Sequence, residues 1–157
     1  MLTRLLLLAA TLLGGLLAGV DLDRALVAIP AWQELGAEAW TAFSRKADLG
    51  NGLILYPLEA IGSTVLTLAA ALSFRFDQTA PRAASLSLYG AALLAAAGLA
   101  FTLKAAPIML GIRGTSDPVA LQHAFEGFVF WGNVRGVWQV LAFVAQLWAL
   151  LELVRQR

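Results

Sequence analysis

The sequence predicts an all-α fold: a four-helix transmembrane bundle with two short interfacial helices on one face. Of the residues, 60% are hydrophobic and only 13% are charged, and the mean hydropathy is +0.77. About a quarter of the residues in a typical soluble domain are charged. Four separate apolar runs each approach the roughly 20 residues that a helix needs to cross a bilayer. The length of 157 residues fits a single integral membrane domain.

The apolar runs give approximate bounds for the four spans, which are residues 5–29, 53–74, 83–106 and 137–154. Pro30 is expected to stop the first helix and Pro107 the third, because proline lacks an N–H group and clashes with the preceding turn. The polar residues 75–82 form the loop between the second and third spans. A Pro at position 118, after Ser116-Asp117, indicates that the last helix starts earlier than its apolar part.

The first run resembles a signal peptide, because Arg4 is followed by a Leu-rich run and then by Leu17-Ala18-Gly19, which resembles a small-residue cleavage site. The stretch continues without a break into further helix-compatible sequence. We therefore expect an uncleaved first helix. Gly15 and Gly19 form a G-x-x-x-G pair, which favours close helix packing either inside one chain or between two copies in a homo-oligomer.

Two stretches outside the spans mix aromatic and charged residues at roughly helical spacing. Ala31–Asn51 is expected to form a short amphipathic helix at the membrane surface, ending in a turn at Gly50-Asn51-Gly52. Val119–Val134 is expected to form a second interfacial or partly buried helix. Four spans place both stretches on one side of the membrane and both termini on the other.

The charges give a prediction of orientation. The side of the termini carries five basic residues and the other side six, so a count of bases does not decide. Eight of the ten acids lie on the side of the interfacial stretches, so many bases there are expected to be paired within the fold. We therefore predict that both termini are cytoplasmic.

Composition excludes several classes of function. The chain has no cysteine, which excludes disulfides, cysteine-ligated zinc and iron–sulfur clusters. The formal net charge is +1 and there is no basic run, so no nucleic-acid partner is expected. A single histidine argues against a dinuclear metal site or bis-histidine haem within one chain. No nucleotide-binding or hydrolase motif is present, and no cofactor is predicted.

Polar residues inside the spans need an explanation, because an ionisable side chain in the bilayer usually faces the bundle interior or a cavity. Glu59 shares one helix face with Tyr56, Ser63 and Thr67, and Arg135 shares another with Gln139 and Gln146. Asp21, Asp23 and Arg24 end the apolar part of the first helix. These groups predict a polar pocket that opens toward the side of the interfacial stretches.

Six residues are predicted to converge on this pocket: Arg45, Asp48, Glu59, His123, Glu126 and Arg135. Structural interpretations remain open for several of them. Glu59 is also explained as an ion-pair partner of Arg24 or Arg135. Asp21 and Arg24 have the spacing of an ordinary i,i+3 pair, and His123 is also explained as a solvated surface residue.

The layout resembles the bacterial family of small four-helix membrane proteins called DUF1772, the anthrone oxygenase-like family. The resemblance rests on short features along the whole chain: Ala18-Gly19, Ile29-Pro30, Phe43-Ser44-Arg45, Pro107-Ile108-Met109, and Trp131 before Arg135. It implies a protein of the bacterial inner membrane. It also implies cofactor-independent oxidation of a lipophilic, anthrone- or quinone-like substrate by molecular oxygen, which reacts with the deprotonated substrate. His123, Glu126 or Asp48 would be the base and Arg45 or Arg135 the stabilising cation.

Two classes of function therefore stay open. The first is a membrane enzyme or binding protein for a lipophilic small molecule that enters from the bilayer. The second is a non-catalytic membrane protein, either an accessory subunit of a membrane complex or a small transporter. A cavity lined by convergent charges would favour the first class, and a continuous water path would favour transport.

Overall fold

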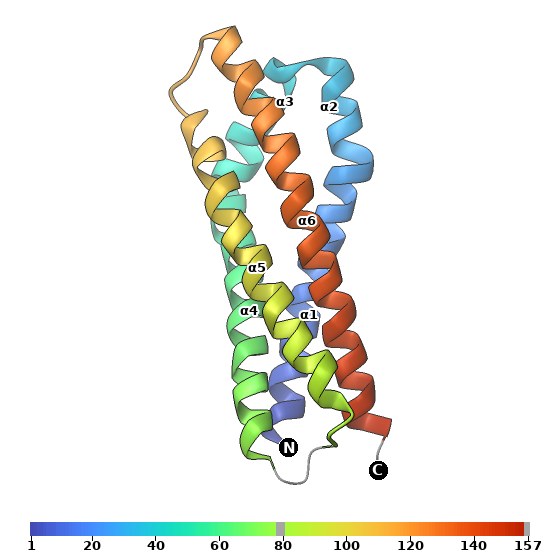
Figure 1. The fold of residues 1–157 in the computed structure, drawn as a ribbon. Coiled ribbons are helices and arrows are strands. Elements are labelled where there is room, and N and C mark those ends of the chain that lie inside the picture. Colours follow the sequence, from blue (N-terminus) through green and yellow to red (C-terminus); the bar gives the residue numbers. More distant parts are fainter. Residues whose placement is uncertain (78–80, 156–157) are drawn as a thin grey trace.

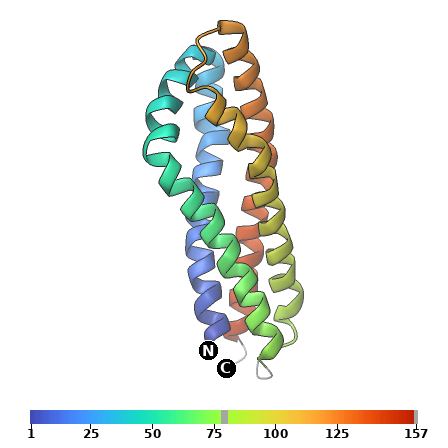
Figure 2. The same ribbon diagram turned by 90° about the vertical axis from the view of Figure 1, so that its left-hand side faces the viewer.

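The structure, a computed structural model, describes residues 1–77 and 81–155. Within these residues it contains helices and no strands, arranged as one elongated bundle (Figure 1, Figure 2). Four helical segments are long and apolar enough to cross a membrane: Leu2–Leu35, Ala37–Phe76, Ala84–Gly111 and Pro118–Arg155. The predicted all-α four-helix bundle is confirmed. By length and composition, the chain is a small integral membrane protein.

The first segment consists of α1 (Leu2–Asp23), a π-helical turn η1 (Arg24–Ala28) and α2 (Ile29–Leu35). The prediction that Pro30 stops the helix was wrong. Pro30 lies at the start of α2, directly after the π-helical turn, where the widened backbone no longer needs its N–H group. The segment ends instead at Gly36, which has φ = 90° and is the one residue with positive φ in the described chain.

The second segment consists of α3 (Ala37–Lys46), a π-helical turn η2 (Ala47–Asn51) and α4 (Gly52–Phe76). The predicted helix of Ala31–Asn51 is therefore divided by Gly36, and its first residues belong to α2. Gly50 has non-helical angles (φ −92°, ψ −118°), so the chain bends at the predicted turn before it enters α4.

The third and fourth segments are single helices, α5 (Ala84–Gly111) and α6 (Pro118–Arg155). Pro107 does not end α5, which continues for four more residues. Val119–Val134 is not a separate interfacial helix either, because it is the first half of α6. Residues 78–80 of the predicted loop lie outside the described residues.

The two ends of the bundle differ. The N-terminus and the C-terminal end of α6 lie together at one end, and α2, α3 and the loop before α6 lie at the other (Figure 1). Near the termini an apolar cluster, here named the lower cluster, fills the bundle; it contains Leu7, Ala70, Ala71, Phe74, Ala84, Leu88, Ala92, Ala149 and Leu153. At the opposite end Trp40 packs on Phe125 and Phe128, with ring centroids 5.3 and 5.1 Å apart.

Candidate functional site

Two buried ion pairs join different segments of the bundle. Arg135 on α6 donates to Asp21 Oδ1 on α1 over 2.9 Å, and the two side chains are 16% and 3% exposed. Arg24 in η1 donates to Asp48 Oδ1 in η2, and the Asp48 side chain is 3% exposed. The expected pair of Asp21 with Arg24 was therefore wrong, because each residue takes its partner from another segment.

The Arg24 guanidinium is also held by aromatic rings. Its Cζ atom lies 4.6 Å from the centroid of Tyr56 on α4 and 5.9 Å from that of Phe128 on α6. A cation over an aromatic face is stabilised by the ring quadrupole, and more so away from water. The π-helical turn carries Arg24 to this position between η2, α4 and α6.

The two ion pairs line a cavity of about 330 Å³ between α1, α4, α5 and α6, here named the inner cavity. Its charged end is formed by Asp21, Arg24, Asp48 and Arg135, with Tyr56 and Gln139 beside them. Its remaining walls are mainly apolar; they include Leu17, Ala60, Leu99, Ala106 and Met109.

The inner cavity reaches the outer surface of the bundle between α4 and α5. Leu53 and Ile61 on α4 and Leu103 and Leu110 on α5 line it, and all four side chains are exposed on the outside of the bundle. Leu103 is 74% exposed. In a spanning bundle such apolar side chains face lipid, so this side of the cavity faces the bilayer.

Several polar atoms at the charged end have no hydrogen-bond partner. They are Asp21 Oδ2, Asp48 Oδ2, Arg135 Nε and Gln139 Oε1. Buried polar groups are nearly always hydrogen-bonded in native proteins, so a group of such atoms around one cavity indicates a missing partner, either a ligand or water. Each ion pair thus satisfies one carboxylate oxygen and leaves the other free.

Glu59 on α4 is buried, as predicted, with 4% of its surface exposed. The expected pairing with Arg24 or Arg135 was wrong, because both arginines are paired elsewhere and Glu59 Oε2 has no hydrogen-bond partner. Glu59 is not among the residues that line the inner cavity.

Below the inner cavity the polar stripe of the sequence forms a compact network. Gln146 Nε2 donates to Ser63 Oγ over 3.1 Å and to Thr67 Oγ1 over 2.8 Å. A void of about 10 Å³ lies between Gln139 and Gln146, which is room for about one water molecule. The lower cluster then closes the bundle toward the termini.

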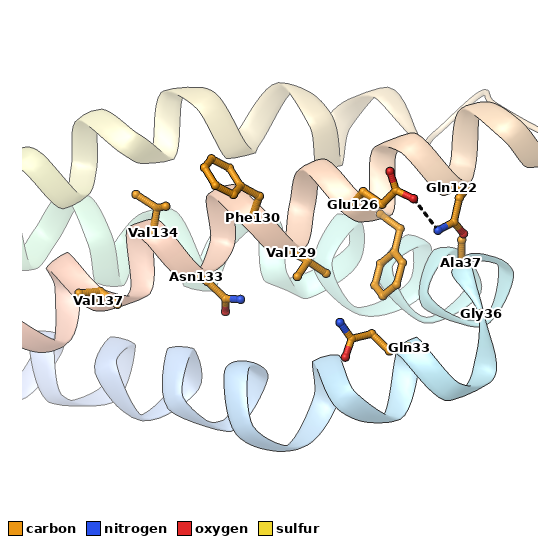
Figure 3. Close-up of a pocket in the computed structure, with 11 residues that line it drawn as sticks. Gln33, Gly36, Ala37, Gln122, Glu126, Val129, Phe130, Asn133, Val134 and Val137 are labelled. Carbon is orange, nitrogen blue, oxygen red and sulfur yellow. Dashed lines mark hydrogen bonds between the residues drawn. The ribbon is translucent and has the colours of Figure 1, made fainter.

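His123 and Glu126 lie apart from the inner cavity. Both are exposed (side chains 77% and 61%), and Nδ1 of His123 is 3.8 Å from Glu126 Oε2. Glu126 lines a separate open groove of about 660 Å³ between α6 and the α2–α3 turn, here named the outer groove. Figure 3 shows Gln33 from α2 and Asn133 from α6 extending into it, and Gln122 donating to Glu126 over 2.9 Å.

Arg45 also lies outside the inner cavity. Its guanidinium donates to the backbone carbonyl oxygen of Ile112 over 2.9 Å from Nε and 2.7 Å from Nη2, and also to that of Thr115. It thereby fixes α3 to the loop after α5, which is a structural role.

The predicted convergence of six residues is thus only partly found. Asp48 and Arg135 line the inner cavity, whereas Arg45, Glu59, His123 and Glu126 do not. The six residues predicted from the sequence do not include Asp21 and Arg24, which complete the charged end of the inner cavity. The signal that pointed to them was their place at the end of an apolar span. Among the described residues no group of three or more His, Cys, Asp or Glu is placed to hold a metal ion.

Comparisons of the chain with protein-family models, with curated proteins and with solved structures found no match. The resemblance to DUF1772 therefore stays a prediction from the sequence.

Proposed function

We propose that this membrane protein binds a lipid-soluble small molecule in the inner cavity and takes it up from the bilayer between α4 and α5. The observation that carries the proposal is a cavity with apolar walls and a buried charged end whose polar atoms are not all paired. Small-molecule sites typically combine mainly apolar lining with a few converging polar groups. A volume of about 330 Å³ suits a ring or head group with part of its tail.

Two alternative functions explain these observations less well. A purely structural role for the charges predicts that they are fully paired and have no cavity beside them, but Asp21 and Asp48 each keep a free oxygen. Transport through the bundle predicts a polar path to the other end. In the described residues the lower cluster closes that end, and the void between Gln139 and Gln146 measures about 10 Å³.

The resemblance to DUF1772 adds oxidation of the bound molecule to this proposal as a hypothesis. Asp48 and Arg135, which the resemblance offers as base and stabilising cation, line the inner cavity. His123 and Glu126 are exposed outside it, so the role of base would fall to Asp48. The site supports binding directly, and turnover would depend on the Asp48 carboxylate being freed from Arg24.

We also propose that the termini face the cytoplasm and, from the resemblance, that the membrane is a bacterial inner membrane. Of the six bases expected on the opposite side, Arg24 and Arg135 are buried in ion pairs and Arg45 is bound to backbone carbonyls. Three other bases lie on that side, Lys46, Lys104 and Arg113, against five bases on the side of the termini. This difference between the two sides supports cytoplasmic termini, which the count of all basic residues did not decide.

The test is to fill the inner cavity. Ala106 lines it from α5, so Ala106→Phe should displace the bound molecule, whereas Ala100→Phe on the exposed face of α5 adds the same side chain outside the cavity. Native mass spectrometry in detergent, with added 5-pentylresorcinol as an amphiphilic probe, should show a one-to-one adduct with the natural protein and with Ala100→Phe. Ala106→Phe should bind about tenfold less. Equal binding by both variants, or no adduct with the natural protein, would overturn the proposal.

A further inference from the structure

The charged end of the inner cavity has more free hydrogen-bond acceptors than donors among its buried atoms. The unpartnered acceptors are Asp21 Oδ2, Asp48 Oδ2 and Gln139 Oε1, and the one unpartnered donor is Arg135 Nε. An ionised carboxylate only accepts hydrogen bonds, and the amide oxygen of glutamine only accepts them too. The occupant that best satisfies this end therefore supplies several donors and at most a few acceptors.

The charges at this end cancel. Asp21 and Arg135 form one pair, and Asp48 and Arg24 form the other. An anionic head group would meet two carboxylates, and a cationic head group would meet two guanidinium groups. A charged head group would also lose its hydration in this buried site and would find no unpaired counter-ion there, which costs free energy. A neutral head group avoids both losses.

Stacking is not the main mode of recognition here. The aromatic faces nearest the charged end belong to Tyr56 and Phe128, and the guanidinium of Arg24 already lies over both rings. Hydrogen bonds to the free oxygens are therefore the interactions left for a ligand. These oxygens come from α1, η2 and α6, so one head group would connect three segments.

From these observations we infer that the inner cavity selects lipid-soluble molecules with a neutral, hydroxyl-bearing head, such as a phenol or alcohol with two or more O–H groups. The O–H groups donate to the free oxygens of Asp21, Asp48 and Gln139. A head group that carries only carbonyl or ether oxygens leaves these acceptors unsatisfied and binds more weakly. The inference rests on the proposed binding function and specifies its ligand class.

The test compares two probes that differ only in their donors. 5-Pentylresorcinol has two O–H groups, and its dimethyl ether keeps the ring, tail and both oxygens but donates no hydrogen bond. Titrated into the detergent-solubilised protein and followed by native mass spectrometry, the resorcinol should bind at least about tenfold more tightly, which corresponds to about 1.4 kcal/mol.

A matched pair of variants assigns this preference to the site. Gln139 and Gln146 are both buried on α6 and both have a free Oε1, but only Gln139 lines the inner cavity. Gln139→Leu should reduce the preference for the resorcinol from about tenfold to about fivefold, because loss of one of three acceptors removes about a third of the preference free energy. Gln146→Leu should lower thermal stability, because it breaks the bonds to Ser63 and Thr67, and should leave the preference unchanged.

The outcomes separate the two proposals. Equal affinity for the resorcinol and its dimethyl ether, with Ala106→Phe still blocking both, would overturn the inferred ligand class and leave the binding function standing. The same holds if Gln139→Leu and Gln146→Leu change the preference equally. If neither probe binds the natural protein, the proposed function fails together with the inference.

Discussion

The Asp21–Arg135 ion pair joins α1 to α6 inside the bundle, where the side chains are only 3% and 16% exposed. Arg135→Gln should leave the Asp21 carboxylate buried without its cation. Removal of one partner of a buried pair typically costs about 3–5 kcal/mol, because the other charge remains uncompensated. We therefore expect a clear fall in the midpoint of thermal unfolding of the protein in detergent.

Two controls identify the cause of this loss. The double variant Asp21→Asn with Arg135→Gln removes both charges and should recover most of the stability. Glu126→Gln removes one partner of the exposed His123–Glu126 pair, and such surface pairs contribute at most about 1 kcal/mol. A double variant that is as unstable as Arg135→Gln alone would show that the arginine acts through packing and not through its charge.

At the scale of single residues, the sequence predicted which charged residues are buried better than it predicted their ion-pair partners. Glu59, Asp48 and Arg135 are buried or nearly so, as an ionisable residue near a span must be to avoid lipid. Their partners depend on how helices cross, which spacing along one helix does not contain. The exposure of His123 agrees with the alternative interpretation of a solvated surface residue and not with its place among the six site residues.

Gly14 on α1 lies where α1 packs closely against α4 and α6. A Cβ atom on Gly14 would collide with Gln146 Oε1 and lie 3.0 Å from Ser63 Oγ, both members of the buried network. The Gln146 side chain is held by two hydrogen bonds and has little freedom to move. Gly14→Ala should therefore destabilise the protein by about 1–3 kcal/mol, measured by thermal unfolding in detergent.

Gly19 on the same helix is the matched control for this prediction. No atom lies within 4 Å of a Cβ added there, so Gly19→Ala should be neutral or slightly stabilising through its better helix propensity. Within the G-x-x-x-G pair the two positions differ, because a Cβ atom on Gly15 would lie 3.0 Å from Phe143 Cε2, whereas one on Gly19 would meet open space. Equal effects at Gly14 and Gly19 would contradict the packing described for α1.

The helix boundaries show which sequence signals hold in a membrane bundle. Pro30 and Pro107 were expected to end helices, as they often do in water, but both helices continue past them. In lipid an interrupted backbone has no water to bond with, so adjustment of the helix is favoured over its termination. Gly36 was the actual break, because its positive φ requires the residue without a side chain.

At the scale of the whole molecule, one end of the bundle is closed and the other holds the proposed binding cavity. The lower cluster closes the end that carries the termini, and the inner cavity lies toward the end that carries α2 and α3. The four spans were evident from the apolar runs alone. The cavity was predicted only as a polar pocket, because its walls depend on how four helices pack and on the π-helical turn η1, which no local sequence pattern indicated.

The orientation of the bundle gives the last prediction. Ser116 lies in the loop before α6, and Ala83 lies just before α5, so one span separates them; both are exposed. The natural chain has no cysteine, so single-cysteine variants carry no background. With the termini in the cytoplasm, a membrane-impermeant maleimide should label Ser116→Cys in intact cells and Ala83→Cys only after permeabilisation. Ser44→Cys should resist labelling in both conditions, because Ser44 is fully buried. The reverse pattern would place the termini outside the cell and contradict the predicted orientation. Labelling of both Ser116→Cys and Ala83→Cys from one side would contradict the four-span topology itself.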